Sequence, residues 1–204
     1  MKNRACIGKV GWAFILFVFL LAGCGGSSPA VKYYTLNTLR EMQQGNAETI
    51  AGESIAIGLG PVDFPKSLER PQIVTRKSQN RIEVSEFHRW ASSLKGDFSR
   101  VLAKNISVLL PASRVAVYPW SDQFSPTYRV ILDVEQFDGL LGEHVLLNVT
   151  WSVVDQTGAN ELVVKNSMIK KAISDKGYEA LVAAESQALG TLSQAIVDEI
   201  RRLR

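Results

Sequence analysis

The N-terminal segment that ends at Cys24 constrains this chain more than any other part of its sequence. The first ten residues carry three basic side chains and no acidic one (Lys2, Arg4 and Lys9), and residues 10–21 are almost entirely apolar. A membrane-spanning helix needs about 20 apolar residues, so this shorter run predicts the core of a signal peptide. The tetrapeptide LAGC that ends at Cys24 has the order of a lipobox, in which small residues precede a cysteine that is acylated on sulfur.

Cleavage before Cys24 divides the chain into three parts. We expect residues 1–23 to be a cleaved lipoprotein signal peptide, residues 24–32 to be the lipidated cysteine with a flexible tether, and residues 33–204 to be the folded domain. Gly25 follows the cysteine, where an aspartate would retain a lipoprotein in the inner membrane. We therefore expect the acyl chains on Cys24 to anchor the protein to the periplasmic face of the outer membrane. The alternative is an ordinary signal or anchor that contains LAGC by coincidence.

The charge and cysteine content of the remaining chain exclude several classes of function. The chain has 23 Lys and Arg residues and 20 Asp and Glu residues, and loss of the three basic residues of the signal leaves 20 of each sign. No basic excess remains to attract nucleic acid, so no such partner is expected. Cys6 leaves with the signal and Cys24 is acylated, so no thiol is left for a disulfide, a zinc site or a nucleophile.

Apolar periodicity predicts strands and two long helices in the mature chain. The helices are expected at residues 94–110, capped by Ser93, and at residues 178–203. In the second helix we place Leu181, Ala188 and Leu192 on the buried stripe, with Glu185 and Glu199 off it. Alternation or apolar character predicts strands at 31–36, 54–59, 72–76, 81–84, 114–118, 128–137, 144–154 and 162–173.

The segments between these elements complete the predicted fold. We expect a loop or linker at residues 37–53, and Gly60-Pro61 to end the strand at 54–59. Residues 77–80 are expected to turn a hairpin. The result is an α+β fold, with a mostly antiparallel sheet and two main helices packed on it in a single domain.

Signs of catalysis are sparse. His88 and His144 belong to no metal-binding motif and no cysteine can join them, so neither a metal nor another cofactor is expected. Asp133 and Glu135 share one face of a predicted strand, which suits a solvated surface better than an acid/base pair. We therefore expect the protein not to be an enzyme.

Aromatic and arginine residues gather at two places in the sequence. One group comprises Arg70, Pro71, Arg89 and Trp90, and the other comprises Tyr118 and Trp120 in the tripeptide Tyr-Pro-Trp. Trp, Tyr and Arg dominate the energetics of protein interfaces, so we interpret both groups as candidate partner interfaces. The alternative is that Trp90 and Trp120 pack into the core at the two ends of the helix at 94–110.

These residues also carry a family resemblance that runs from Tyr33 to the C-terminus. Its parts are Tyr33-Tyr34-Thr35-Leu36, Ile57 to Pro65, Arg70 to Val74, Arg89-Trp90-Ala91 with Leu94, Asn105 and Leu109, Tyr118-Pro119-Trp120, Val134 to Phe137, Gly142 to Trp151, Gly177-Tyr178 and Glu199 to Leu203. In their order and spacing after a lipobox, the chain resembles the PqiC (YmbA) lipoproteins, auxiliary outer-membrane components of MCE-type ABC transport systems. Ser92-Ser93 departs from the acidic residue and proline of many relatives.

The resemblance implies a part in moving lipid between the two membranes and in supporting membrane integrity. Its implied partners are an MCE-domain protein that spans the envelope and the inner-membrane transport components, with a homo-oligomeric ring as a further possibility. The family has no catalytic residues to transfer. Two alternatives stay open: a direct lipid carrier with a pocket between helix and sheet, and an envelope regulator lipoprotein.

Overall fold

A mixed eight-stranded sheet is the framework of the fold. The computed structural model describes residues 29–43 and 54–204, and Val31–Arg204 form one unit. Cys24, the signal peptide and most of the tether therefore lie outside the described residues. The strands are β1 (Lys32–Tyr34), β2 (Ala56–Asp63), β3 (Gln72–Ser78), β4 (Arg81–Trp90), β5 (Arg114–Val117), β6 (Tyr128–Leu140), β7 (His144–Val154) and β8 (Glu161–Ala172).

The predicted α+β class is confirmed, and the mostly antiparallel sheet is confirmed in part, because the sheet is mixed. Its longest ladders, β6 with β7 and β7 with β8, are antiparallel, as is the β3–β4 hairpin. By contrast, β1 pairs in parallel with β4, and β2 pairs in parallel with both β5 and β6. Parallel neighbours need a crossover between them, and periodicity within one strand does not reveal which distant strand lies beside it.

The strand β6 organises this arrangement. One of its edges pairs with β7 along nearly its whole length. Its other edge pairs with β2 from Tyr128 to Asp133 and then meets β3 at Leu140. The resulting strand order is β1-β4-β3-β6-β2-β5, so β1 and β5 lie at the two ends of this path.

In residues 29–43 and 54–204 the α-helices are α2 (Leu39–Gln43), α3 (Leu94–Leu109) and α4 (Tyr178–Arg202), with a 3₁₀ turn η1 (Lys66–Leu68). The predicted cap of α3 is confirmed, because the Ser93 side chain accepts a hydrogen bond from the Gly96 N–H. The short helix α2 corrects the loop predicted at 37–53 over its first residues. A capping box explains it: the Thr38 N–H donates to Glu41 at 2.6 Å, and the Glu41 N–H donates back to the Thr38 hydroxyl at 3.3 Å.

Two predicted strand ends are wrong. Gly60-Pro61 does not end β2, which continues to Asp63 after its register against β6 shifts between Leu59 and Val62. This irregularity accommodates a proline, which cannot donate to a regular ladder, and a glycine with φ of 117°. The second error concerns the strand predicted at 81–84, which continues to Trp90 as β4.

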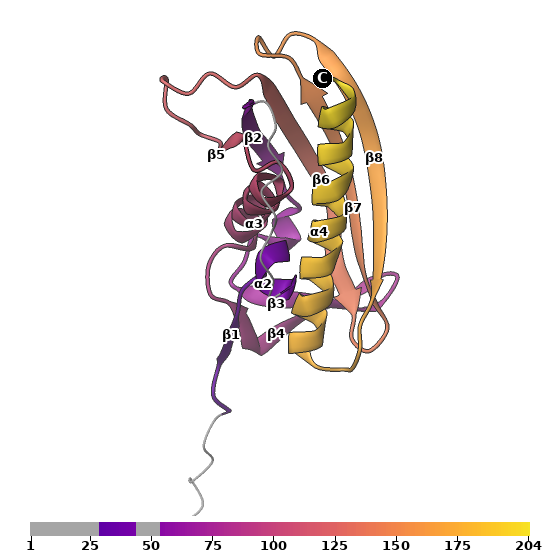
Figure 1. The fold of residues 1–204 in the computed structure, drawn as a ribbon. Helices are drawn as coiled ribbons and strands as arrows, with labels where there is room; N and C mark the ends of the chain where they lie inside the picture. Colours follow the sequence, from indigo (N-terminus) through magenta and orange to yellow (C-terminus); the bar gives the residue numbers. More distant parts are fainter. Residues whose placement is uncertain (1–28, 44–53) are drawn as a thin grey trace, which may run out of the picture. The chain divides into compact units, whose positions relative to one another are not determined.

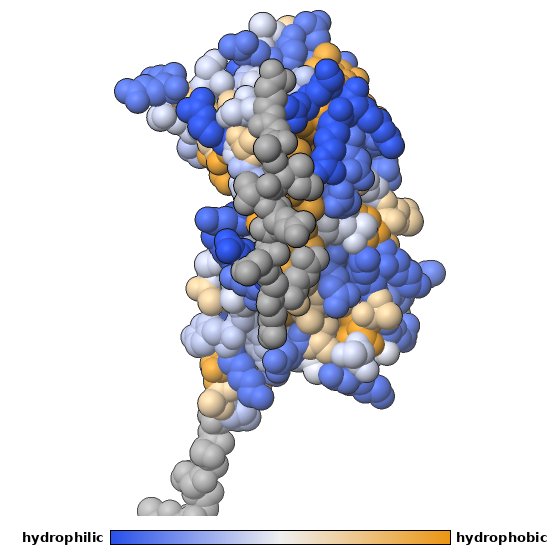
Figure 2. Space-filling model, viewed as in Figure 1, coloured by the Kyte–Doolittle hydropathy of each residue, from blue (hydrophilic) through white to orange (hydrophobic). Residues whose placement is uncertain are grey.

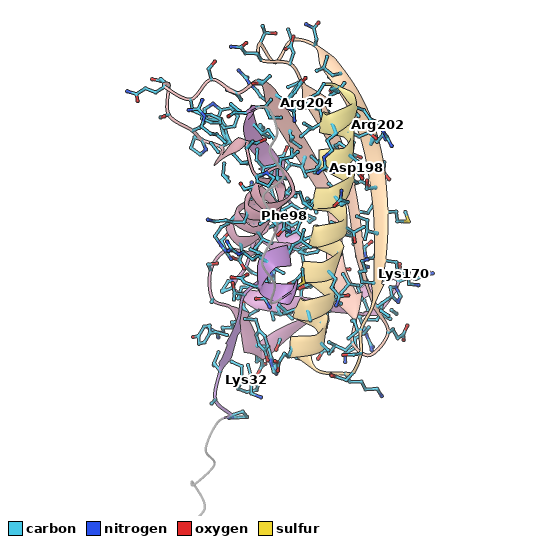
Figure 3. All side chains as sticks on the ribbon, viewed as in Figure 1. Lys32, Phe98, Lys170, Asp198, Arg202 and Arg204 are labelled. Atoms are coloured by element: carbon cyan, nitrogen blue, oxygen red, sulfur yellow. The ribbon has the colours of Figure 1, made fainter. Side chains whose placement is uncertain are left out.

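The core lies between the sheet and the two long helices. Figure 1 shows α4 running along β6, β7 and β8, with α3 beside it. One face of β7 points into this core, since Val145, Leu147, Val149, Trp151 and Val153 are all buried. On the neighbouring strand β8, the Lys170 side chain projects away from α4 (Figure 3).

Glu185 and Glu199 of α4 correct the predicted polar side of this helix, because both are buried. Glu185 follows Leu181 by four residues and precedes Ala188 by three, which places it on the buried stripe itself. Glu199 is compensated there by ion pairs with Lys165 of β8 and with Arg202. Within the described residues, the Oε2 atom of Glu185 is buried and forms no hydrogen bond.

Buried polar side chains hold the segment that follows β1. The Asp97 carboxylate of α3 accepts hydrogen bonds from the Leu36 N–H at 2.7 Å and from the Thr35 hydroxyl at 2.9 Å. Farther along, the Asn105 side chain accepts from the Leu39 N–H at 2.8 Å, and Ser186 of α4 accepts from the Asn37 N–H at 3.0 Å. The first part of the domain after the tether is therefore fixed to both long helices.

Candidate partner-binding surface

The loop between β5 and β6 carries a cluster of aromatic rings and arginines. The Trp120 ring lies 5.5 Å from that of Tyr118 and 6.0 Å from that of Phe124, in edge-on contacts. The guanidinium groups of Arg114 and Arg129 lie about 6 Å from the rings of Phe124 and Trp120, respectively. We call these five residues the aromatic–arginine surface; Tyr118 is its most accessible ring, at 56% exposure.

The absence of a side chain at Gly58 of β2 leaves room for the Trp120 ring. A Cβ atom built on Gly58 would lie 2.7 Å from the indole ring, so only glycine lets the ring rest against the strand. The neighbouring strand supplies Arg129, which is paired with Gly58 and donates a hydrogen bond to the Gln156 carbonyl at 2.9 Å. Fixed backbone on three strands thus orients the rings, which reduces the entropy lost when a partner binds.

Sequence reasoning selected Tyr118 and Trp120 but missed three members of this cluster. Arg114 begins β5, Phe124 lies within the loop, and Arg129 is the second residue of β6. A signal for Phe124 was present, since Tyr-Pro-Trp and Phe-Ser-Pro both fall within this one connection. The two arginines gave no such signal, because their closeness depends on the pairing of β2 with both β5 and β6.

The other predicted group is divided by the structure. Arg70 and Pro71 are exposed at the edge of a hollow of about 390 Å³, whose wall includes Trp90 and the start of α3. Trp90 itself is only 4% exposed, and its backbone N–H donates a hydrogen bond to the Pro71 carbonyl at 2.7 Å. Arg89 does not line this hollow. It pairs with Tyr33 of β1 and Gln72 of β3, on the other face of β4.

The two predicted groups are not brought together. Trp90 ends β4 beside β1, whereas Tyr118 and Trp120 follow β5 at the other end of the strand path. Each group has to be considered as a separate surface. The aromatic–arginine surface has the greater exposed aromatic area, and it is the stronger candidate for a protein partner.

His88 is in contact with two tyrosine side chains. His88 stacks on Tyr178 with ring centroids 3.9 Å apart, and its Nδ1 atom lies 2.7 Å from the Tyr34 hydroxyl. Burial, followed by the nearby charge of Lys32, lowers the pKa of His88. Within the described residues, no group of three or more His, Cys, Asp and Glu side chains is placed to hold a metal ion.

The described helices also bear on the relation to a membrane: none in residues 29–43 and 54–204 has both the length and the hydropathy to span a bilayer. The model of the family described as "ABC-type transport auxiliary lipoprotein component" matches residues 34–197. The chain belongs to this family, and the resemblance found in the sequence is confirmed.

Solved structures show the same fold at low sequence identity. An uncharacterized protein is similar with a TM-score of 0.69 and 20% identity, covering 84% of this chain and 99% of that one. A Xanthomonas campestris protein is similar with a TM-score of 0.61 and 15% identity, covering 84% of this chain and 91% of that one. No curated protein matches the sequence.

Proposed function

We propose that this lipoprotein docks the envelope-spanning MCE protein of a lipid transport system at the periplasmic face of the outer membrane, and so supports membrane integrity. Membership of the transport auxiliary family supports the general role. In this proposal the acyl chains on Cys24 hold the domain at the membrane, and a protein surface binds the end of the MCE channel. The role is one of binding and positioning, with no catalytic step and no cofactor.

The observation that carries the proposal is the position of the aromatic–arginine surface. The anchored tether enters the domain at β1, and the aromatic–arginine surface follows β5, at the other end of the strand path. Figure 1 shows β1 and β5 at different ends of the domain. A domain held at the β1 end can therefore present Tyr118 and Trp120 away from the membrane. A closed ring of such domains would match a rotationally symmetric partner.

The packing between helices and sheet does not favour a lipid carrier. That role needs an apolar cavity, and the space between α3, α4 and the sheet is occupied by large buried side chains, among them Phe98, Phe137 and Trp151. Phe98 and Phe137 meet edge to face at 5.4 Å, and Phe64 contacts both. Side chains packed in this way leave each other little freedom to admit an acyl chain.

Replacing Trp120 with alanine is expected to abolish capture of the MCE protein while the domain remains folded. Hot-spot aromatics contribute about 2–4 kcal/mol to binding, which corresponds to a loss of affinity of roughly 30- to 900-fold. The measurement is photo-crosslinking in the envelope from a reporter at Ser121, followed by identification of the captured proteins. Met168→Ala, on the exposed face of β8, is the matched control. Capture of wall synthases alone would overturn the proposal, and unfolding of Trp120→Ala would assign this ring to stability.

Replacing Cys24 with serine is expected to leave a folded domain without its acyl anchor. Because tethering supplies the high local concentration at the membrane, transport should fall to the level of a deletion strain even though the domain is present. Fractionation and a lipid-transport or detergent-sensitivity assay measure the two effects. A variant exported with a cleavable signal of the ordinary kind provides the control for export. Full function of that soluble form would contradict docking through an anchor.

A further inference from the structure

The first strand after the tether exposes an aromatic and an apolar side chain. Tyr33 is 66% exposed although it pairs with Arg89 of β4, and Val31, which immediately precedes the strand, is 38% exposed. Val31 lies two positions before Tyr33, the spacing that puts side chains on one side of an extended chain. Pairing adds Arg89 of β4 and Gln72 of β3 to this face. We call these four residues the β1 face.

Several side chains on the other side of the same strands are covered. Tyr34 bonds to His88, His88 stacks on Tyr178 at the start of α4, and Trp90 is buried. These contacts fix β1 to β4 and leave the β1 face as the side that is open to solvent. Figure 2 shows apolar and hydrophilic residues side by side around β1, and Figure 3 places Lys32 at the beginning of this strand.

The charge of the β1 face is positive. Arg89 forms no ion pair or hydrogen bond through its side chain with the described residues, and its buried Nε atom has no partner. An exposed Tyr beside an Arg is a combination that suits the headgroup region of a bilayer.

The length of the tether determines what this face can reach. Lys32 follows Cys24 by eight residues, so a fully extended tether spans at most about 28 Å. The β1 face therefore cannot move farther than this from the acylated cysteine. Within such a distance even a weak attraction to the bilayer is effective, because the anchor keeps the two surfaces at high effective concentration.

We propose that the β1 face binds the phospholipid headgroup layer of the membrane that holds the anchor, with Tyr33 and Val31 entering the interface and Arg89 contacting lipid phosphate. The domain then has one preferred orientation on the membrane and does not swing freely on its tether. This goes beyond docking of a protein partner and rests only on the chain being an acylated lipoprotein. It concerns a bilayer surface, and not a pocket for a transported lipid.

The test uses the acylated protein in vesicles of phosphatidylethanolamine with and without phosphatidylglycerol. After acylation of Cys24 the mature chain has no other cysteine, so Gln72→Cys supplies one labelling site on the β1 face and Met168→Cys supplies one on β8 for comparison. Each carries an environment-sensitive fluorophore, and a headgroup nitroxide lipid quenches it. We expect stronger quenching at position 72 than at position 168, and stronger quenching with phosphatidylglycerol.

Two further variants separate docking from mere proximity. Duplicating residues 25–29 lengthens the tether, and quenching at position 72 should persist if the β1 face is bound. Arg89→Gln should lower the ratio of bound to free domain about fivefold with phosphatidylglycerol, the equivalent of ~1 kcal/mol per basic residue. Equal quenching at both positions, or a loss of quenching in proportion to tether length, would overturn the proposal. Neither readout involves the MCE protein, so the result is independent of partner docking.

Discussion

Replacing Asp97 with alanine is expected to lower the free energy of unfolding by about 3 kcal/mol, because two hydrogen bonds to a buried charged group are lost. The carboxylate accepts from the Leu36 N–H and the Thr35 hydroxyl, and it pairs with Arg100. Leu36 is buried, so no water replaces the missing acceptor for its N–H. The segment that joins the anchor to the domain should then detach locally before the rest of the chain unfolds.

Thermal unfolding and amide hydrogen exchange measure this effect. A loss of this size should lower Tm by roughly 6–12 °C in a domain of this length. Exchange of the Leu36 amide should accelerate more than that of amides in β7. The matched control is Asp133→Ala, since Asp133 is exposed on β6. An unchanged Tm, or uniform acceleration across all amides, would show that Asp97 does not hold this segment in particular.

Replacing Glu185 with glutamine is expected to stabilise the domain at alkaline pH and to leave it nearly unchanged at acidic pH. Burial, and secondarily the charge of Asp138, raises the pKa of Glu185 well above its ordinary value of 4.5. The folded state therefore retains a proton that the unfolded chain releases. The contribution of Glu185 to the free energy of unfolding is greatest below pH 4.5. It falls as the pH rises from 4.5 through the pKa that Glu185 has in the folded state.

The size of this effect follows from the cost of a buried charge. Each unit by which the folded-state pKa is raised costs ~1.4 kcal/mol above that pKa. Denaturant unfolding between pH 4 and pH 9 should show a falling stability for the parent chain and a flatter profile for Glu185→Gln. Glu179→Gln, at the exposed start of α4, is the control. Parallel profiles for the parent and Glu185→Gln would contradict a protonated Glu185 in the folded state.

The sequence pattern predicted correctly those features that depend only on residues within one helix or strand. The Ser93 cap, the inward face of β7 and the two long helices depend on side chains a few residues apart, and all were predictable. The error at Gly60-Pro61 has a different origin. Whether a proline ends a strand or sits in an irregularity depends on the partner strand, and the partner of β2 here is β6, far along the chain.

The candidate surfaces divide in the same way. Tyr118 and Trp120 were recognisable because they are adjacent in sequence, but Arg114, Arg129 and Gly58 join them only through strand pairing. Arg89 was predicted as part of one group with Arg70 and Trp90, and the alternation of β4 turns its side chain away from Trp90.

By itself the sequence determined the LAGC motif that ends at Cys24, the balance of acidic and basic residues after it, the absence of a further cysteine beyond Cys24 and the family resemblance. These properties follow from residue identity and local order, so no folding is needed to infer them. Only the tertiary structure decided which strands are parallel, that the Oε2 atom of Glu185 is buried without a hydrogen bond to the described residues, and that Tyr33 and the aromatic–arginine surface lie at different ends of the strand path. Each of these depends on contacts between residues far apart in the chain, and the side-chain pattern of one segment carries no record of its distant neighbours.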